Sequence, residues 1–400
     1  MRSLNLIEDF ARNPSEEAMA SVVASAIGDS WGVDEIGRLA EVLAHSGTTL
    51  AFPDDIVTAD VASTGGPSSL STLLCPLYLR NLGFQIPKLG VPGRPAGGID
   101  ILAQVPGYKA NPDAPTARAV LDRCGYVHFL AGPDFAPLDA ILFRYRQRSG
   151  AQDVPPLAVA SILAKKIACG IKSAGLDVRV APHGNFGGDF ATARQTAKSF
   201  CVAAKAVGIA AVAGLTDART PYQPYIGRGE SLLALRKLID DSSDQWLLEH
   251  ADRCLLLAAN VGALHPGHAP LVKEIGKPFF ENIVAQGGTE AGFLDKVESI
   301  ARAPRVEIAA QQGGFFSLDL AGLRSVFATA NASTDKEPFP DNLGLILRKR
   351  PGSFVKNGEI LASVRATTGV WAACAEPLTK CFRITELMDY ALGLEEFVRA

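Results

Sequence analysis

A strand, a loop of small residues and a helix follow one another near the start of this chain. The segment 56–61 is rich in β-branched residues, which predicts a strand. The segment 70–82 is apolar at helical spacing and ends before Gly83, which predicts a helix. In the loop between them, Gly65 and Gly66 allow the backbone to turn and to approach a ligand closely. A strand that passes through a short loop into a helix is a building unit of α/β folds.

The residue types in this loop favour an anion site. N–H groups at the start of a helix attract negative charge, helped by the helix dipole, and Pro67 suits the first helical position. Side-chain hydroxyls add hydrogen-bond donors. The candidate anion- or phosphate-binding residues are Ser63, Thr64, Gly65, Gly66 and Thr72. An ordinary βα turn without a ligand is the alternative, because short glycine motifs occur in many unrelated loops.

A second glycine-rich loop follows the strand predicted at 84–89 and covers residues 90–98. Ligands of open α/β sheets bind at the carboxyl ends of the strands, so Arg94 in this loop is a candidate for binding a phosphate or carboxylate. A rigid connector with a solvated arginine is the alternative reading of the same residues.

The order of the predicted elements divides the chain into three units. Residues 1–50 and 137–172 are predicted to be helical and to form a discontinuous helical lobe. Residues 51–136 and 173–302 alternate strands with helices, which indicates an α/β domain with a mainly parallel sheet that carries the candidate anion site. Residues 303–400 are predicted to form a small C-terminal domain of strands and helices, with strands at 306–310, 343–347 and 360–364.

Composition excludes several function classes. The chain is 48% hydrophobic and 20% charged, which is typical of globular proteins, and its net charge of −3 gives no basic footprint for nucleic acid. Seven cysteines without zinc-site spacing argue against a metal site and a disulfide framework, and fit a reducing cytoplasm. The apolar run 206–215 is too short to cross a bilayer, and the N-terminus lacks a signal-peptide core. We expect a cytoplasmic protein with no cofactor, metal, nucleic-acid or membrane partner.

The helix predicted in the region 155–168 carries Ser161 and Lys165 four residues apart, so the two side chains share one helix face. Arg146 lies fifteen residues before Ser161. Taken alone, a lysine on a helix is most simply solvated and a serine is a tolerated small residue.

These motifs resemble the thymidine phosphorylase and pyrimidine nucleoside phosphorylase family. The resemblance rests on Asp60-x-x-Ser-Thr-Gly-Gly, on Ser-Ile-Leu-x-Lys-Lys beginning at Ser161, and on the spacing to Arg146, and it continues through most of the chain. It implies that Arg146, Ser161 and Lys165 hold the pyrimidine, and that Arg146 and Lys165 stabilise the base as it leaves. It also implies a pentosyltransferase of pyrimidine metabolism and phosphate as a co-substrate bound by the two glycine loops. The α/β domain would then bind the anion and the sugar, and the helical lobe would form a homodimer contact. His183 is a weaker acid/base candidate in a loop facing the cleft.

The sequence departs from this family in the anion site. The family has a lysine and a histidine before Ser63, whereas this chain has Val61 and Ala62. The second loop is shorter, and Pro92 stands where the family has a serine. Each lost charge-assisted contact costs about 1.5–3 kcal/mol. We therefore expect an intact base-binding half, a weakened phosphate-binding half, and weak or absent phosphorolysis.

Three functions stay open at this point. The first is a pentosyltransferase that cleaves or forms the N-glycosidic bond of a pyrimidine nucleoside or close analogue, with phosphate use in doubt. The second is a phosphate-independent nucleosidase. The third is a non-catalytic or regulatory homologue that binds a pyrimidine.

Overall fold

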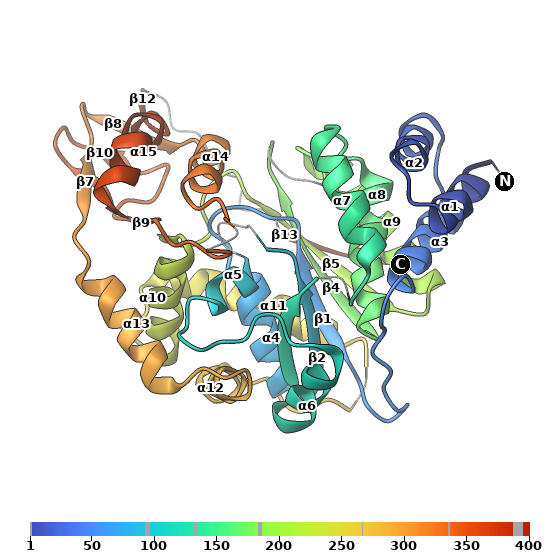
Figure 1. Ribbon diagram of the computed structural model, residues 1–400. Helices are drawn as coiled ribbons and strands as arrows, with labels where there is room; N and C mark the ends of the chain where they lie inside the picture. Colours follow the sequence, from blue (N-terminus) through green and yellow to red (C-terminus); the bar gives the residue numbers. More distant parts are fainter. Residues whose placement is uncertain are drawn as a thin grey trace.

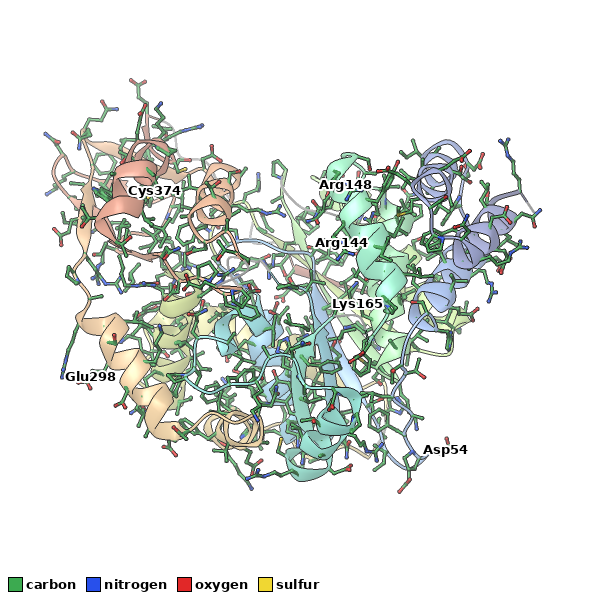
Figure 2. All side chains as sticks on the ribbon, viewed as in Figure 1. Asp54, Arg144, Arg148, Lys165, Glu298 and Cys374 are labelled. Carbon is green, nitrogen blue, oxygen red and sulfur yellow. The ribbon has the colours of Figure 1, made fainter. Side chains whose placement is uncertain are left out.

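The computed structural model describes residues 2–92, 97–131, 134–182, 186–265, 267–334, 337–386 and 395–400. A group of helices at one edge, a central sheet with its covering helices, and a small C-terminal unit at the opposite edge lie side by side (Figure 1). In Figure 2, Lys165 in the helical group and Cys374 in the C-terminal unit lie on opposite sides of the molecule.

The central sheet is mainly parallel, which confirms the predicted α/β class. Its centre consists of three parallel strands: β1 (Ala59–Ser63), β4 (Ser173–Val180) and β5 (Ala210–Asp217). The strand β13 (Glu395–Arg399) adds to β5 in the antiparallel direction. A parallel pair, β2 (Ile86–Gly90) and β3 (Tyr126–Leu130), meets the chain just before β1 at a single bridge between Thr58 and Gln85.

The helical lobe is formed by five helices, predicted in the same regions of the chain: α1 (Arg2–Arg12), α2 (Glu16–Gly28), α3 (Val33–Ala44), α7 (Pro137–Arg148) and α8 (Pro155–Ala168). Prolines begin α7 and α8, where a missing N–H costs nothing. The helix α3 packs on both α8 and α9 (Phe190–Ala206), with Leu39 and Leu163 fully buried. Since α9 covers β5, this core joins the lobe to the sheet.

The two faces of the sheet bury separate cores. Alternate side chains of β5 point to opposite faces, so Ala213 and Leu215 join the core beneath α9, whereas Val212 joins the core beneath α4 and α11. The remaining helices of this domain are α4 (Ser71–Asn81), α5 (Gly98–Leu102), α6 (Ala114–Cys124), α10 (Arg228–Ile239), α11 (Gln245–Gly262), α12 (Gly276–Ala285) and α13 (Glu290–Arg302). Across the described ranges, no helix has both the length and the apolar character needed to cross a membrane.

The C-terminal unit contains two small antiparallel sheets and two helices. Its elements are β7 (Val306–Ala309), β8 (Gly314–Leu318), α14 (Leu320–Ala330), β9 (Leu343–Leu347), β10 (Phe354–Val355), β11 (Ile360–Ala366), α15 (Thr368–Lys380) and β12 (Phe382–Thr385). The chain crosses the limits predicted for this unit twice. The short strand β6 (Tyr225–Ile226) pairs with β9, and β13 returns to the central sheet. Backbone hydrogen bonds therefore tie the unit to the rest of the molecule.

The glycine loop after β1 leads into the helix α4, which starts at Ser71, close to the start predicted at residue 70. Pro67, which suits the first helical position, lies in the loop before this helix. Gly65 and Gly66 have φ angles of 102° and 121°, which only glycine adopts readily. The guanidinium of Arg179 donates to the carbonyl of Gly65 and to the carboxylate of Asp177, so β4 holds the turn in place.

We expect Gly66→Ala to lower the free energy of unfolding by about 1–3 kcal/mol, since the alanine would have a positive φ and a steric clash. The new Cβ would lie 2.5 Å from Nη1 of Arg179, and the hydrogen bonds of Arg179 hold its side chain in this position. Gly65→Ala has a φ of 102° but open space, so it should cost less. Gly369→Ala, in the first turn of α15 with no atom within 4 Å, is the control. Urea denaturation in which Gly66→Ala is as stable as the control would contradict this account.

Candidate active site

A cleft lies where the helical lobe faces the carboxyl ends of β1 and β2. Its cavity volume is about 170 Å³, which is smaller than the roughly 300–1,000 Å³ typical of small-molecule sites. Six of the residues singled out in the sequence line it together: Ser63, Thr64, Thr72, Arg146, Ser161 and Lys165. Gly65 and Gly66 are not among its lining residues, and Arg94 and His183 lie outside the described residues.

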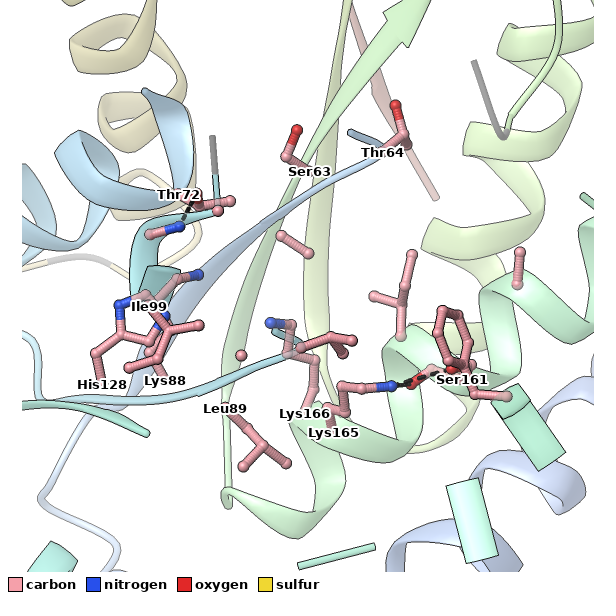
Figure 3. Close-up of a pocket in the computed structure, with 18 of the residues that line it drawn as sticks. Ser63, Thr64, Thr72, Lys88, Leu89, Ile99, His128, Ser161, Lys165 and Lys166 are labelled. Atoms are coloured by element: carbon pink, nitrogen blue, oxygen red, sulfur yellow. Dashed lines mark hydrogen bonds between the residues drawn. The ribbon is translucent and has the colours of Figure 1, made fainter. Parts of the chain in front are cut away.

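The α8 pair forms a direct contact across one helical turn. The ammonium of Lys165 donates to Oγ of Ser161 at 3.0 Å and to the Ser161 carbonyl oxygen at 2.9 Å (Figure 3). Its third partner is the carboxylate of Asp139 on α7. All three N–H bonds of Lys165 therefore have acceptors, while the Ser161 hydroxyl accepts from the lysine and keeps its own hydrogen for a ligand.

Arg146 is almost fully buried and closes the connection between α7 and α8. Its guanidinium donates to the backbone carbonyls of Ala151 at 3.2 Å, Leu157 at 3.2 Å and Gln152 at 2.5 Å. Burial lowers the pKa of Arg146 to about 10, although nearby Asp139 opposes the shift, so the side chain stays charged at neutral pH. A guanidinium has five N–H donors, and these contacts leave one on each terminal nitrogen for a ligand.

Asp139 is a site residue that the sequence analysis passed over. It is buried, pairs with Lys165 and lies close enough to Arg146 to affect its pKa. The signal was present in the spacing: Asp139 and Arg146 are seven residues apart on α7, so two helical turns place them on the same face. One carboxylate thus stands behind the two cations of the predicted base site.

The hydroxyls of the glycine loop have unequal freedom to bind an anion. Ser63 and Ser71 donate to the Asp177 carboxylate at 3.0 and 2.5 Å, so their hydroxyl hydrogens are directed away from a ligand. Thr64 and Thr72 accept hydrogen bonds from the backbone N–H groups of Arg179 and Gly98, which leaves their own hydrogens available. This assigns Thr64 and Thr72, rather than Ser63, the stronger anion-binding geometry.

The start of α4 is not open to a ligand in the way predicted for a helix N-terminus. The N–H of Leu70 donates to Nε2 of His250 at 2.8 Å, and the N–H of Ser71 donates to Oγ of Ser69 at 3.1 Å. These contacts within the protein replace the expected contacts with an anion, because the helix begins beyond the glycine turn.

Two buried lysines reach the cleft from different elements and share one carboxylate. Lys88 of β2 donates to Oδ1 of Asp60 at 2.7 Å and to the Val61 carbonyl at 2.5 Å. Lys166 of α8 forms an ion pair with the other oxygen of Asp60. Burial opposes ionisation of Asp60, but the charges of Lys166 and Lys88 prevail and lower the pKa of Asp60 to about 2. The Asp60 carboxylate is therefore ionised at neutral pH. Burial lowers the pKa of Lys88, although the charge of Asp60 opposes this shift.

His128 of β3 lies opposite Lys88 in the strand ladder and also lines the cleft. Its Nδ1 is 3.1 Å from the Tyr126 hydroxyl. Burial lowers the pKa of His128 well below its usual value, and the charge of Lys88 adds to the shift. The imidazole is therefore neutral at neutral pH, where it serves as a hydrogen-bonding group and not as a cation.

The sequence contained signals for both lysines. Lys88 lies in an apolar strand, and a lysine in such a position is almost always paired when buried. Lys166 was overlooked because it follows Lys165, yet successive helical residues point about 100° apart. Figure 3 shows the result: Lys165 extends toward Ser161, while Lys166 extends in another direction, on the side of Lys88.

Comparison with known proteins supports the predicted relationship. The pyrimidine-nucleoside phosphorylase of Geobacillus stearothermophilus is 24% identical over 378 residues, covering 90% of this chain and 86% of that protein. The thymidine phosphorylase of Sinorhizobium fredii is 29% identical over 373 residues, covering 88% of this chain and 84% of that protein. No protein-family model matches the chain. The resemblance inferred from the motifs is thus confirmed by similarity over about nine-tenths of the chain.

A solved structure supports the fold independently. The anthranilate phosphoribosyltransferase of Thermus thermophilus superposes with a TM-score of 0.52 and covers 75% of this chain and 94% of its own. Its sequence identity is 13%, so the likeness concerns the fold alone.

A double-mutant cycle between Asp139 and Lys165 should measure a coupling of about 1–3 kcal/mol. Each single variant, Asp139→Asn or Lys165→Met, removes one partner of this buried ion pair, so the double variant should be more stable than the sum of the singles predicts. The exposed pair Arg118–Asp122 is the control, for which we expect about 0.5 kcal/mol or less. Equal coupling in the two cycles, measured by urea unfolding, would show that Asp139 does not hold Lys165.

Proposed function

We propose that this chain, a relative of the thymidine and pyrimidine-nucleoside phosphorylases, is a pentosyltransferase that acts on the N-glycosidic bond of a pyrimidine nucleoside or close analogue. The observation that carries the proposal is the cleft in which Arg146, Ser161 and Lys165 face the carboxyl ends of β1 and β2. Phosphate, where it takes part, is a co-substrate and not a cofactor.

The chemistry of this bond matches the donors of the helical lobe. When the bond between C1′ of the sugar and the base nitrogen breaks, the electron pair remains on the base, and negative charge spreads to its carbonyl oxygens. Preorganised donors in a buried site stabilise such developing charge strongly. Arg146 offers two N–H bonds, Lys165 a positive charge and Ser161 a hydroxyl hydrogen.

The opposite wall of the cleft would receive the sugar and its acceptor. Thr64 and Thr72 offer hydroxyl hydrogens there, and the cleft continues to Gly90 at the end of β2. Because base and acceptor contact different parts of the fold, approach of the lobe and the sheet would bring the reacting atoms together and exclude water.

A non-catalytic pyrimidine-binding protein is the second candidate. Lys165 directs all its N–H bonds to Asp139 and Ser161, so it must exchange one of them before it contacts a base. In addition, Ala62 stands where the related family carries a histidine against the nucleoside. Binding without turnover would follow if this exchange does not occur.

Purified protein incubated with thymidine or uridine should release the free base, measured by chromatography with and without phosphate. Sugar 1-phosphate as the second product would indicate phosphorolysis, and free sugar would indicate a nucleosidase. Pyrimidine binding without release of base would contradict the transferase and support the non-catalytic alternative.

Lys165→Met should weaken pyrimidine-base binding by about tenfold or more, because a charge-assisted contact contributes about 1.5–3 kcal/mol. Arg144→Met is the matched control, since Arg144 lies in the same lobe, is exposed, and also loses one positive charge (Figure 2). Calorimetric titration with thymine and uracil gives the comparison. If both variants change the affinity equally, Lys165 does not contact the base.

A further inference from the structure

The connection between α7 and α8 carries a polar side chain that has no part in the base site described above. Gln152 lies in this connection, is half-buried and lines the cleft. Its backbone carbonyl accepts the hydrogen bond from the Arg146 guanidinium at 2.5 Å, which fixes the main chain of Gln152 beside the proposed base site. Its side-chain amide forms no hydrogen bond within the described ranges of the chain. One amide oxygen and one NH2 group in the lining of the cleft are therefore unused.

The donors assigned to the base so far do not match every polar group of a pyrimidine. Arg146 and Lys165 carry N–H donors only, and the Ser161 hydroxyl accepts from Lys165 and has its hydrogen free for a ligand. Such groups suit carbonyl oxygens. A pyrimidine base also carries N–H groups, at N3 of uracil and in the C4 amino group of cytosine, and a buried N–H group without an acceptor costs free energy. The amide oxygen of Gln152 supplies such an acceptor.

Much of this part of the lining is apolar. Phe143, Ala158 and Ile162 line the cleft from α7 and α8, and Phe186 lines it from the loop after β4. Apolar side chains pack against the faces of a flat ring but form no hydrogen bonds with its edge. In a pocket of this kind, a small number of placed polar groups fixes the orientation of the ligand and provides specificity. Gln152 adds an amide to this small number.

The attachment of the base to the sugar determines which edge of the base faces the lobe. The sugar is bound at N1, and C4 is the ring atom opposite N1. With the pentose toward β1 and β2, as proposed above, the C4 edge points toward α7, α8 and the connection that carries Gln152. On this edge, N3 and the C4 substituent are neighbours, and in uracil and in cytosine one of them is a donor and the other an acceptor. An amide presents the same pair of groups in one plane.

We propose that Gln152 determines base specificity through two hydrogen bonds, to N3 and to the C4 substituent, so that the cleft accepts both uracil-type and cytosine-type bases. The inference rests on the proposed function, because it names the class of base that the same cleft takes. For uracil, the amide oxygen accepts from N3–H and the NH2 group donates to O4.

The same side chain serves cytosine after a rotation of its amide by half a turn. The NH2 group then donates to N3, and the amide oxygen accepts from the C4 amino group. A lining with donors alone would favour the carbonyl group of uracil and leave the amino group of cytosine without an acceptor. Acceptance of both bases is therefore the property that Gln152 adds.

Calorimetric titration of the full-length protein with uracil, cytosine and 2-pyrimidinone, which lacks a C4 substituent, tests this assignment. Uracil and cytosine should bind with affinities within about tenfold of each other, and each about tenfold more tightly than 2-pyrimidinone, because the last compound loses one hydrogen bond. Gln152→Met keeps the length of the side chain and removes the amide. It should weaken the binding of uracil and cytosine about tenfold and that of 2-pyrimidinone less, so the advantage of a C4 substituent disappears.

Gln147→Met makes the same chemical change at an exposed position on α7 and is the control, whose affinities should equal those of the unaltered chain. A purely structural role for Gln152 makes a different prediction: Gln152→Met would weaken all three compounds to the same extent, and the proposal would be overturned. Unchanged affinities in Gln152→Met would also overturn it. So would binding of uracil without measurable binding of cytosine, or no binding of any of the three compounds.

Nucleoside turnover, measured in parallel, separates this inference from the proposed function. Base binding that depends on Gln152 and on the C4 substituent, in a protein that releases no base from uridine or cytidine, would support the role of Gln152 while the transferase fails. Release of uracil from uridine with a kcat/KM that Gln152→Met leaves unchanged would overturn the role of Gln152 while the function stands. Turnover of both nucleosides, with kcat/KM reduced about tenfold in Gln152→Met, would support both.

Discussion

One buried carboxylate, Asp60, connects the parts of the molecule that form the cleft. It lies on β1 and pairs with Lys88 of β2 and Lys166 of α8. A bridge between Thr58 and Gln85 joins the segments that lead into these two strands, and the Lys88 ammonium provides a further link through the Val61 carbonyl. Separating the sheet from the helical lobe would break the ion pair between Asp60 and Lys166 and leave buried charge unpaired. The cluster therefore holds the sheet and the lobe in one relative position.

The same arrangement recurs at the other end of the cleft. Asp139 lies next to Lys165 and Arg146, as Asp60 lies next to Lys88 and Lys166. The four cations line the cleft, whereas the two carboxylates are not among its lining residues. Such placement fixes long cationic side chains before a ligand arrives. Charges that are already oriented when a ligand binds are the basis of electrostatic preorganisation.

Local patterns predicted much of the fold. The strand predicted at 343–347 has those bounds in the structure, and the helix predicted at 70–82 is found as Ser71–Asn81. The failures lie in the glycine loop, where Ser63 turns its hydroxyl toward Asp177, 114 residues away in sequence. The residue types of a loop do not show which distant side chain accepts hydrogen bonds from its hydroxyl groups.

The sequence by itself determined the alternation of strands and helices, because this alternation depends on periodicity. The resemblance of its short motifs to the phosphorylases singled out Arg146, Ser161 and Lys165. Only the tertiary structure decided which cations line the cleft beside β1 and β2. Lys88 contacts the Val61 carbonyl from another strand, and Lys166 contacts Asp60 from a helix 106 residues further along the chain. Electrostatic energy depends on distance in space and on burial, and neither follows from separation along the chain.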